Sequence, residues 1–147
     1  MMPQNIETSI SINASAEKVW RIFTDFKEYP RWNPFLKRVF GKPTQNSSAI
    51  VFDFYFKGIF LPAKVIIYTC VFASEISWRG GFPLFLKYLF FGDHRFLFEE
   101  VSKNQTLFKH RAVLSGIMPS ILKTHIQTAV KNSHLEMNQK LKELSER

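Results

Sequence analysis

Between residues 35 and 116 the hydrophobic pattern alternates with a period of two, and this series of short strands is what most limits the possible fold. Successive side chains on a β-strand point to opposite faces, so the alternation predicts strands with one buried face. Strands are expected at 35–41, 49–56, 63–72, 75–80, 93–101 and 106–116. Because tight turns such as SKNQ (102–105) join consecutive strands, the sheet is predicted to be antiparallel.

The segment before these strands predicts one more strand, over residues 6–15, and two short helices. The first helix follows a capping residue, Asn13 or Ser15, and is expected to end near Asp25. Its inward side chains recur at helical spacing and are Val19, Trp20, Phe23 and Phe26. The second helix covers 27–32 and ends before Pro34. Asn33, in the bend, is expected to bond nearby backbone.

The C-terminal segment predicts one long amphipathic helix that begins at Pro119. It would contain some 25 residues and extend for about 40 Å. The apolar stripe consists of Leu122, Ile126, Ala129, Val130, Met137, Leu141 and Leu144. A sheet that twists around this helix leaves a gap between the two layers. The fold class is therefore α+β.

The length and amino-acid composition of the chain limit the kind of protein that it can form. With 147 residues and a 46% hydrophobic composition, it is expected to form a single domain, residues 1–147, with a packed core. The 16 Phe predict a ring-lined interior. Cys70 has no cysteine partner and the N-terminus shows no charged-then-apolar leader, so a cytoplasmic location is expected.

The net charge of +8 would attract anions. The basic residues are scattered, however, with no run of four or more, so a solvated basic surface is expected and nucleic acid is not an expected partner. No apolar run approaches the roughly 20 residues of a membrane-spanning helix. The sequence does not determine the oligomeric state.

Short segments spread along nearly the whole chain carry a family resemblance through their order and spacing. They are INASAEKVWRIFTDFKEYPRWNPF, WRG, GDHRF, TLFKHRAVLSG and MNQKLK. Together they resemble the SRPBCC superfamily of START domains and the birch-pollen allergen, and within it the bacterial polyketide cyclase/dehydrase-like and lipid-transport members. The resemblance implies a helix-grip fold, in which an antiparallel seven-stranded curved sheet wraps around a long C-terminal helix, with two short helices after the first strand.

The resemblance also implies a deep, mostly apolar cavity between the sheet and the C-terminal helix, holding a lipid-like or polycyclic aromatic molecule. Trp32 and Phe35, in the bend YPRWNPF, would rim or plug it, and ordinary core packing of Trp32 is an equally good interpretation. The expected ligand contacts are Trp32, Phe35, Phe54, Phe56, Trp78, Phe96, Phe98, Phe108, His110, Ile126, Val130 and Met137. The polar side chains that could orient the ligand are His110, Tyr55 or Tyr68, and Arg79.

Two histidines are predicted to point into this cavity. Because alternate residues of a strand share a face, His94 lies on the same face as Phe96, and His110 on the same face as Phe108 and Ala112 of the next strand. An imidazole there could orient a ligand carbonyl or act as a general acid or base, and a structural histidine bonded to a neighbour is the alternative. Many relatives carry a Glu where this chain has Ala112, which weakens the interpretation as an enzyme.

No metal site is expected. Either plausible hairpin register offsets His94 and His110 by two to four residues, which is roughly 7–13 Å at about 3.3 Å per residue. His125 and His134 lie about two and a half turns apart on the helix. No cofactor is expected either, because no phosphate-cradling or nucleophile-elbow motif is present.

The apolar segment FPLFLKYLFF (82–91) permits three interpretations. It could be an extended strand end inside the core, a lid over the cavity mouth, or a contact with a membrane or partner. In the last case Phe85, Leu86 and Leu89 would enter the apolar layer, while Lys87 would seek lipid phosphate.

The sequence therefore favours the binding or transport of a hydrophobic small molecule over catalysis. Burial of apolar area would supply the affinity. The alternative is a polyketide cyclase- or dehydratase-like enzyme that uses His110 as its acid or base.

Overall fold

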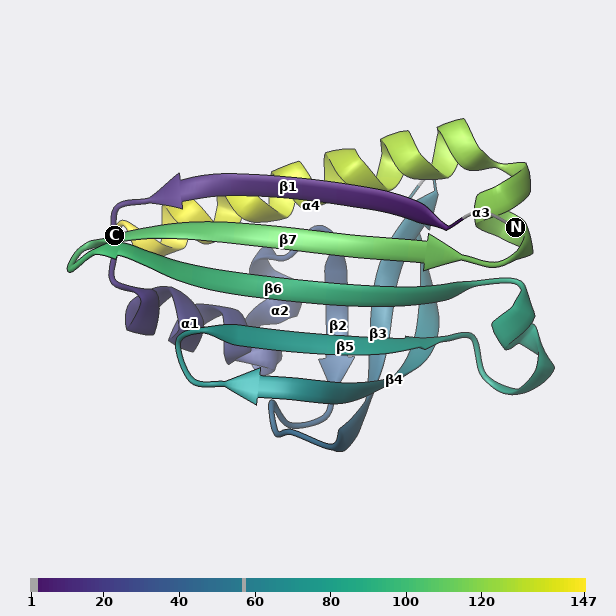
Figure 1. Cartoon of the computed structure of the whole chain (residues 1–147), viewed down its shortest axis with the longest axis horizontal. Helices are drawn as coiled ribbons and strands as arrows, with labels where there is room; N and C mark the ends of the chain where they lie inside the picture. The colour runs from purple at the N-terminus through teal and green to yellow at the C-terminus, as the bar shows by residue number, and fades with distance from the viewer. Residues whose placement is uncertain (1–2, 57) are drawn as a thin grey trace.

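A seven-stranded antiparallel sheet curves around the C-terminal helix in the computed structural model of the chain (Figure 1). The structure describes residues 3–56 and 58–147, without the side chains of 54–56. The strand order is β1-β7-β6-β5-β4-β3-β2, and this confirms the predicted helix-grip fold. The strands are β1 (Gln4–Ile12), β2 (Leu36–Phe40), β3 (Ser47–Phe56), β4 (Ile59–Val71), β5 (Glu75–Gly81), β6 (Phe91–Ser102) and β7 (Gln105–Ser115).

The helices lie at the two ends and on the concave face of the sheet (Figure 1). They are α1 (Ala16–Thr24), η1 (Phe26–Glu28), α2 (Tyr29–Trp32), η2 (Leu84–Tyr88), α3 (Ile117–Ile121) and α4 (Lys123–Ser145). The α1 end of the molecule also holds the C-terminus, whereas η2, α3 and the start of β1 lie at the opposite end. Within the described residues, no helix has both the length and the apolar character that crossing a bilayer requires.

The first helix forms as its sequence predicts. Ser15 caps α1, since its hydroxyl oxygen accepts the Lys18 backbone N–H at 3.2 Å, and the helix gives way at Asp25. Phe23 then faces the sheet, where its ring centroid lies 4.7 Å from that of Phe96 and 5.5 Å from that of Phe108. This aromatic contact fixes α1 against the concave face of the sheet.

The predicted single C-terminal helix is wrong in one respect, because the chain divides it into α3 and α4. Leu122 leaves helical geometry, with φ −99° and ψ 30°. In a continuous helix the Pro119 carbonyl would accept the Lys123 backbone N–H, but here it accepts the side-chain amide of Gln4. The contact with β1 thus replaces a helical hydrogen bond at the break.

The turn between β3 and β4 differs from the prediction, and the outer face of β4 is open to solvent. The predicted turn over 57–62 is shorter, since β4 already begins at Ile59, after Gly58 at φ 77°, while Lys57 lies outside the described residues. The outer face of β4 is not covered, because Ile66 is 54% exposed.

The buried face of β3 is the one that carries Val51 and Asp53. Ile50 is exposed, whereas Val51 and Asp53 are buried. Both faces of this strand are apolar, so alternation alone did not distinguish them. The predicted ligand contacts Phe54 and Phe56, together with Tyr55, have side chains outside the described residues.

The segment 82–91 does not extend a strand into the core. Residues 84–88 form the 3₁₀ helix η2, and Leu84 has the positive φ of 58° that a bulky side chain rarely adopts. Phe90 returns to the core before β6 begins. The interpretation as a buried strand end is therefore wrong for 84–88.

The bend after α2 is held by a buried amide. The Asn33 side-chain oxygen accepts the backbone N–H groups of Phe35 at 3.0 Å and Leu36 at 2.8 Å. This confirms that Asn33 bonds local backbone, and it sets the direction in which the chain enters β2.

Replacing Asn33 by Ala is expected to lower the free energy of unfolding by about 2 kcal/mol, because two buried N–H groups lose their acceptor. Urea denaturation followed by circular dichroism measures this change. The matched control is Asn132→Ala, at an exposed position of α4, which should leave the midpoint nearly unchanged. Equal midpoints for the two variants would contradict the role assigned to Asn33.

Candidate functional site

Three histidines from different elements meet in the interior. His94 comes from β6, His110 from β7 and His134 from α4, and all three are buried. His94 Nδ1 lies 3.1 Å from His110 Nε2, and the rings of His110 and His134 stack with centroids 3.7 Å apart. One nitrogen from each ring falls within 4.8 Å of the other two.

The predicted separation of His94 and His110 is wrong, although their inward direction is as expected. The register pairs His94 with Ala112 and His110 with Phe96, so the offset is two residues. Diagonal neighbours on a sheet lie within reach of long side chains, and the small Ala112 opposite His94 leaves room for the two rings to converge.

His134 is the member of the cluster that the sequence prediction missed. It lies on the buried stripe of α4, between Val130 and Met137. A search for polar residues on that stripe would have found it, together with Asn138, whose amide donates to the Thr8 hydroxyl at 3.0 Å.

Aromatic rings surround the three imidazoles. The Phe35 centroid lies 4.3 Å from that of His134, and the Phe96 centroid lies 4.2 Å from that of His110. Among the described residues, His110 Nδ1 and both ring nitrogens of His134 have no hydrogen-bond partner. Such orphaned nitrogens in a buried, ring-lined site call for an explanation, because buried polar groups are nearly always paired.

Burial keeps the three imidazoles neutral. It lowers the pKa of His94 to about 4 and the pKa values of His110 and His134 well below their usual range. Repulsion from its neighbours further lowers the pKa of His110. A neutral imidazole of such low basicity is a poor general acid or base at pH 7, so the cluster is better suited to hydrogen bonding or ligation.

The interior residues predicted to contact a ligand are buried wherever their side chains are described, and they pack against one another. The Trp78 ring lies 4.8 Å from Phe96, and Phe98 lies 5.2 Å from Phe108. The others of this set that the structure buries are Phe35, His110, Ile126, Val130 and Met137. These rings occupy much of the space between the sheet and the helices.

Trp32 is placed differently, on a groove at the α1 end of the molecule. This groove, which we call the α2–α4 groove, has a volume of about 610 Å³ and is lined by Ile22, Asp25, Glu28, Arg31, Trp32, Lys140, Glu143, Leu144 and Arg147. The Trp32 indole N–H is buried without a partner among the described residues. Nothing from 82–91 lines the groove, so that segment is not a lid over it.

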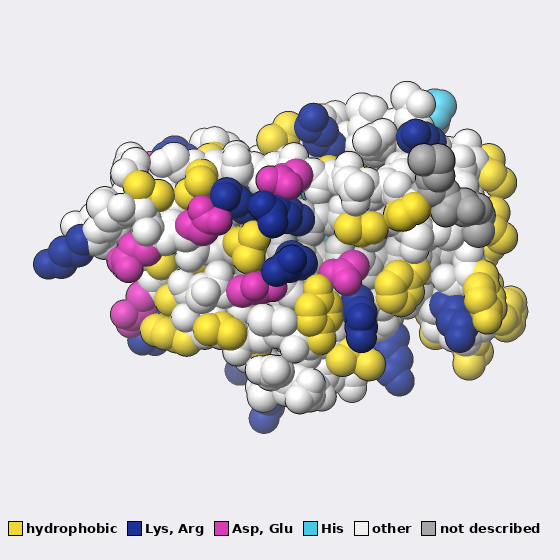
Figure 2. All heavy atoms as spheres, in the orientation of Figure 1, with side chains coloured by type: hydrophobic (Ala, Val, Ile, Leu, Met, Phe, Trp, Pro, Cys, Tyr) yellow, Lys and Arg dark blue, Asp and Glu magenta, His cyan; other side chains and the backbone are white. Residues whose placement is uncertain are grey.

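Two of the polar candidates lie on the outer face of the sheet, so the prediction that they point inward is wrong. The Tyr68 hydroxyl donates to Asp93 at 2.6 Å, which with burial raises its pKa to about 12, and the Arg79 guanidinium lies over the Tyr68 ring. Cross-strand ion pairs also lie on this face, with Lys109 bonded to Glu99 at 2.8 Å (Figure 2).

Comparison with known proteins identifies related sequences and folds. The sequence matches the family model "Polyketide cyclase / dehydrase and lipid transport" over residues 3–143. A sequence search of the curated proteins finds no match.

Solved structures share the fold over nearly the whole chain. The Zhui aromatase/cyclase from Streptomyces sp. R1128 aligns with a TM-score of 0.80 at 12% identity, over 99% of this chain and 95% of its own. A START superfamily protein from Mycobacterium smegmatis gives 0.71 at 18% identity, with 95% and 98% covered. A norcoclaurine synthase point mutant from Thalictrum flavum gives 0.69 at 12% identity, with 97% and 94% covered. At these identities the likeness shows a common fold.

The histidine cluster predicts a steep loss of stability in acid. Unfolded histidines titrate near pH 6.5, whereas the folded pKa values of His94, His110 and His134 lie well below that. The stabilising contribution is therefore complete above pH 6.5 and is lost as the pH falls toward the folded pKa values. Each histidine should lower the free energy of unfolding by about 1.4 kcal/mol per pH unit in this window.

Urea titrations between pH 7 and 5 in the presence of EDTA measure this slope. His94→Gln should reduce it by one histidine's share, and His125→Gln, at an exposed position of α4, should not. A stability that stays constant between pH 7 and 5 would show that the three imidazoles are solvated.

Proposed function

This chain belongs to the polyketide cyclase/dehydrase and lipid transport family, within the SRPBCC superfamily, and we propose that it binds a hydrophobic small molecule in the α2–α4 groove. The volume of about 610 Å³ is in the range of small-molecule sites, which are commonly 300–1,000 Å³. The groove lies where α2 and the last turns of α4 approach each other, at one end of the space between sheet and helix.

The observation that carries this proposal is the unpaired indole N–H of Trp32. A buried donor without a partner is costly. The N–H is closed to solvent in this structure, so a ligand oxygen would supply the missing acceptor once the indole ring turns this edge toward the groove. The ring of Trp32 also continues inward to Tyr29, with centroids 5.3 Å apart. Tyr29 thus supports the Trp32 ring from the core side, and the apolar part of a ligand can lie against Trp32, Ile22 and Leu144.

The charges on the rim limit the class of ligand. Arg31 is paired with Glu28 at 2.8 Å, and Lys140 with Glu143 at 3.2 Å. Because the basic and acidic residues of the lining balance, net charge gives little attraction for an anion. A mainly apolar ligand with an oxygen acceptor, such as a polycyclic phenol or ketone or a neutral lipid, fits best. The deeper contacts proposed at Phe35, Trp78, Phe96, Phe98, Phe108, His110, Ile126, Val130 and Met137 stay predictions.

Replacing Trp32 by Ala is expected to weaken the binding of a fluorescent apolar probe, anilinonaphthalene sulfonate, by about tenfold or more, since both the ring and its donor are lost. Trp32→Phe keeps a ring and should weaken it two- to tenfold, or about 0.5–1.5 kcal/mol. The matched control is Trp20→Phe, in α1 but outside the groove lining. Equal probe affinities for the Trp32 and Trp20 variants would place the ligand elsewhere.

A second candidate function, membrane contact, is favoured by the exposed apolar surface of η2 and α3, which we call the apolar tip. Leu84 is 81% exposed, Phe85 73% and Ile121 75%, while Leu89 is half-buried and its carbonyl accepts the Met118 N–H at 2.9 Å. Yellow side chains gather at this end in Figure 2.

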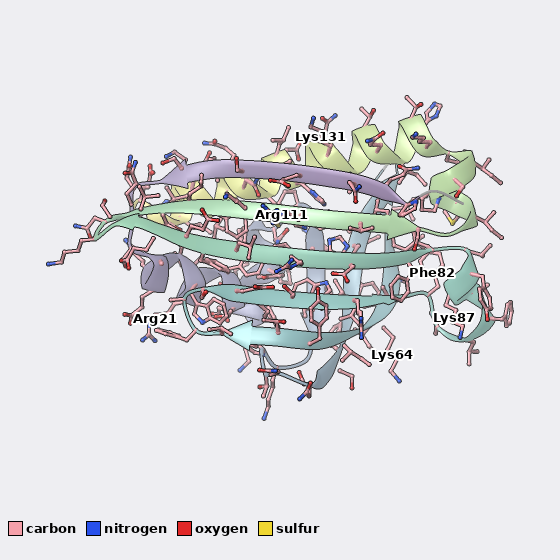
Figure 3. The ribbon with its side chains drawn as sticks, viewed as in Figure 1. Arg21, Lys64, Phe82, Lys87, Arg111 and Lys131 are labelled. Atoms are coloured by element: carbon pink, nitrogen blue, oxygen red, sulfur yellow. The ribbon has the colours of Figure 1, made fainter. Side chains whose placement is uncertain are left out.

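The charge of this end favours an anionic bilayer over a neutral partner. Residues 82–91 and 116–135 include Lys87, Lys123 and Lys131 but no Asp or Glu. Figure 3 shows Lys87 on the η2 loop, at the end of the molecule away from Arg21. Apolar side chains beside lysines are typical of peripheral membrane contacts. Phe85 and Leu86 would enter the interface, with Lys87 at the lipid phosphates.

Replacing Phe85 by Ser is expected to weaken binding to phosphatidylglycerol-containing vesicles about tenfold, because one large apolar side chain no longer enters the interface. Co-sedimentation measures this, and binding should fall as salt is raised. Phe40→Ser, at another exposed phenylalanine, is the control. Loss of binding in both variants, or none in either, would contradict the tip as the contact.

A further inference from the structure

We propose that His94, His110 and His134 form a binding site for a transition-metal dication, with zinc as the expected ion. The site is separate from the α2–α4 groove, whose lining includes none of the three. Ion binding at the cluster and probe binding in the groove can therefore be measured separately.

The geometry requires only a small contraction of the cluster. Two nitrogens on one zinc at about 2.0–2.1 Å lie roughly 3.3 Å apart in tetrahedral geometry. His94 Nδ1 and His110 Nε2 are already 3.1 Å apart, and all three ligand atoms fall within 4.8 Å of one another. The His134 ring is stacked on His110, with centroids 3.7 Å apart, so it must turn out of this stack to direct a nitrogen toward the same ion.

The hydrogen-bond inventory supports the same conclusion. Each neutral imidazole offers one lone pair to a metal and one N–H. His134 uses neither of its nitrogens, and His110 leaves Nδ1 unpaired, among the described residues. An ion bound to His94 Nδ1, His110 Nε2 and one nitrogen of His134 would engage a His134 lone pair that has no partner among the described residues, and it would replace the His94–His110 hydrogen bond.

The charge state is also suitable. A metal binds the neutral imidazole, and all three rings are buried among apolar side chains, where the charged imidazolium is disfavoured. The two strands and the helix hold the rings in place, and Phe35 and Phe96 pack against them. The cluster is thus preorganised on regular elements, as precise sites usually are.

The ligand set indicates which ions fit. Imidazole nitrogen suits zinc, copper, iron and nickel, whereas calcium and magnesium prefer oxygen. Three histidines are also a known protein ligand set for zinc, with a fourth position left for water or an anion. We therefore expect binding of Zn²⁺ and Co²⁺ and none of Mg²⁺.

The test is a titration of the full-length, EDTA-treated protein with Zn²⁺ by calorimetry, and with Co²⁺ by visible absorption. Because the site is buried, the protein is also refolded from urea with the ion present. The expected result is one ion per chain, the visible absorption bands of four-coordinate Co²⁺, and a melting temperature that rises with zinc concentration. Mg²⁺ should change none of these.

Two variants and two controls locate the ion. His134→Gln and His94→Gln should each weaken Zn²⁺ binding about 100-fold, since a ligand is lost. His125→Gln, at the exposed histidine of α4, and Cys70→Ser, at the free thiol, should bind as the parent does. Weakening in either control, or full binding in both histidine variants, would overturn the proposal by placing the ion elsewhere.

X-ray absorption at the zinc edge of the parent protein needs no variant and keeps the proposal testable if a core substitution prevents folding. Three imidazole nitrogens in the first coordination sphere are expected. A sulfur ligand, fewer than three imidazoles, or no stoichiometric zinc after refolding would overturn it. Probe binding in the groove is measured on the same samples, so failure of one site is distinguished from failure of the other.

Discussion

The contact between α4 and the concave face of the sheet is the interaction on which the rest of the structure depends. A curved sheet has one apolar face that must be buried, and here a single helix, with α1 at one end, covers it. Polar side chains on the covering stripe therefore need partners. Asn138 finds Thr8, and Ser133 bonds its own helix at Ala129. Of these three side chains, His134 is the one that makes no hydrogen bond among the described residues. Packing against the sheet therefore does not account for this polar residue.

Much of the fold could be predicted because strands and helices leave different periods in the sequence. The alternation in 93–101 and 106–116 placed His94 and His110 inward, as they are. It could not place the inner face of β3, where Ile50 and Val51 are equally apolar. The meeting of three imidazoles could not be predicted either, since it depends on how side chains lean across a diagonal of the register and on which turn of α4 crosses β7. Both depend on the tertiary structure and leave no pattern in the local sequence.

The molecule keeps different chemistry at its two ends. At the α1 end, acids and bases alternate around the α2–α4 groove, as in the pairs of Glu28 with Arg31 and of Glu143 with Lys140. At the η2 end, lysines stand beside exposed apolar side chains and no acid occurs in 82–91 or 116–135. An asymmetric charge of this kind orients a protein on an anionic surface. A bilayer bound at the apolar tip would leave the groove facing the solvent, so a ligand would exchange there.

The histidine cluster lies between these ends. A contribution to folding stability does not explain why histidines occupy these three buried positions. Phenylalanine at the three positions would keep the aromatic packing around Phe35 and Phe96 and would remove the unpaired nitrogens of the cluster. Each such nitrogen costs about 1–3 kcal/mol when buried, and protonation on unfolding adds a further cost in acid. Local rules are commonly broken at functional sites, where another interaction offsets the cost. A bound ion is such an interaction, because it needs neutral, buried imidazoles whose nitrogens lie close together. The same properties lower the free energy of unfolding when no metal is bound.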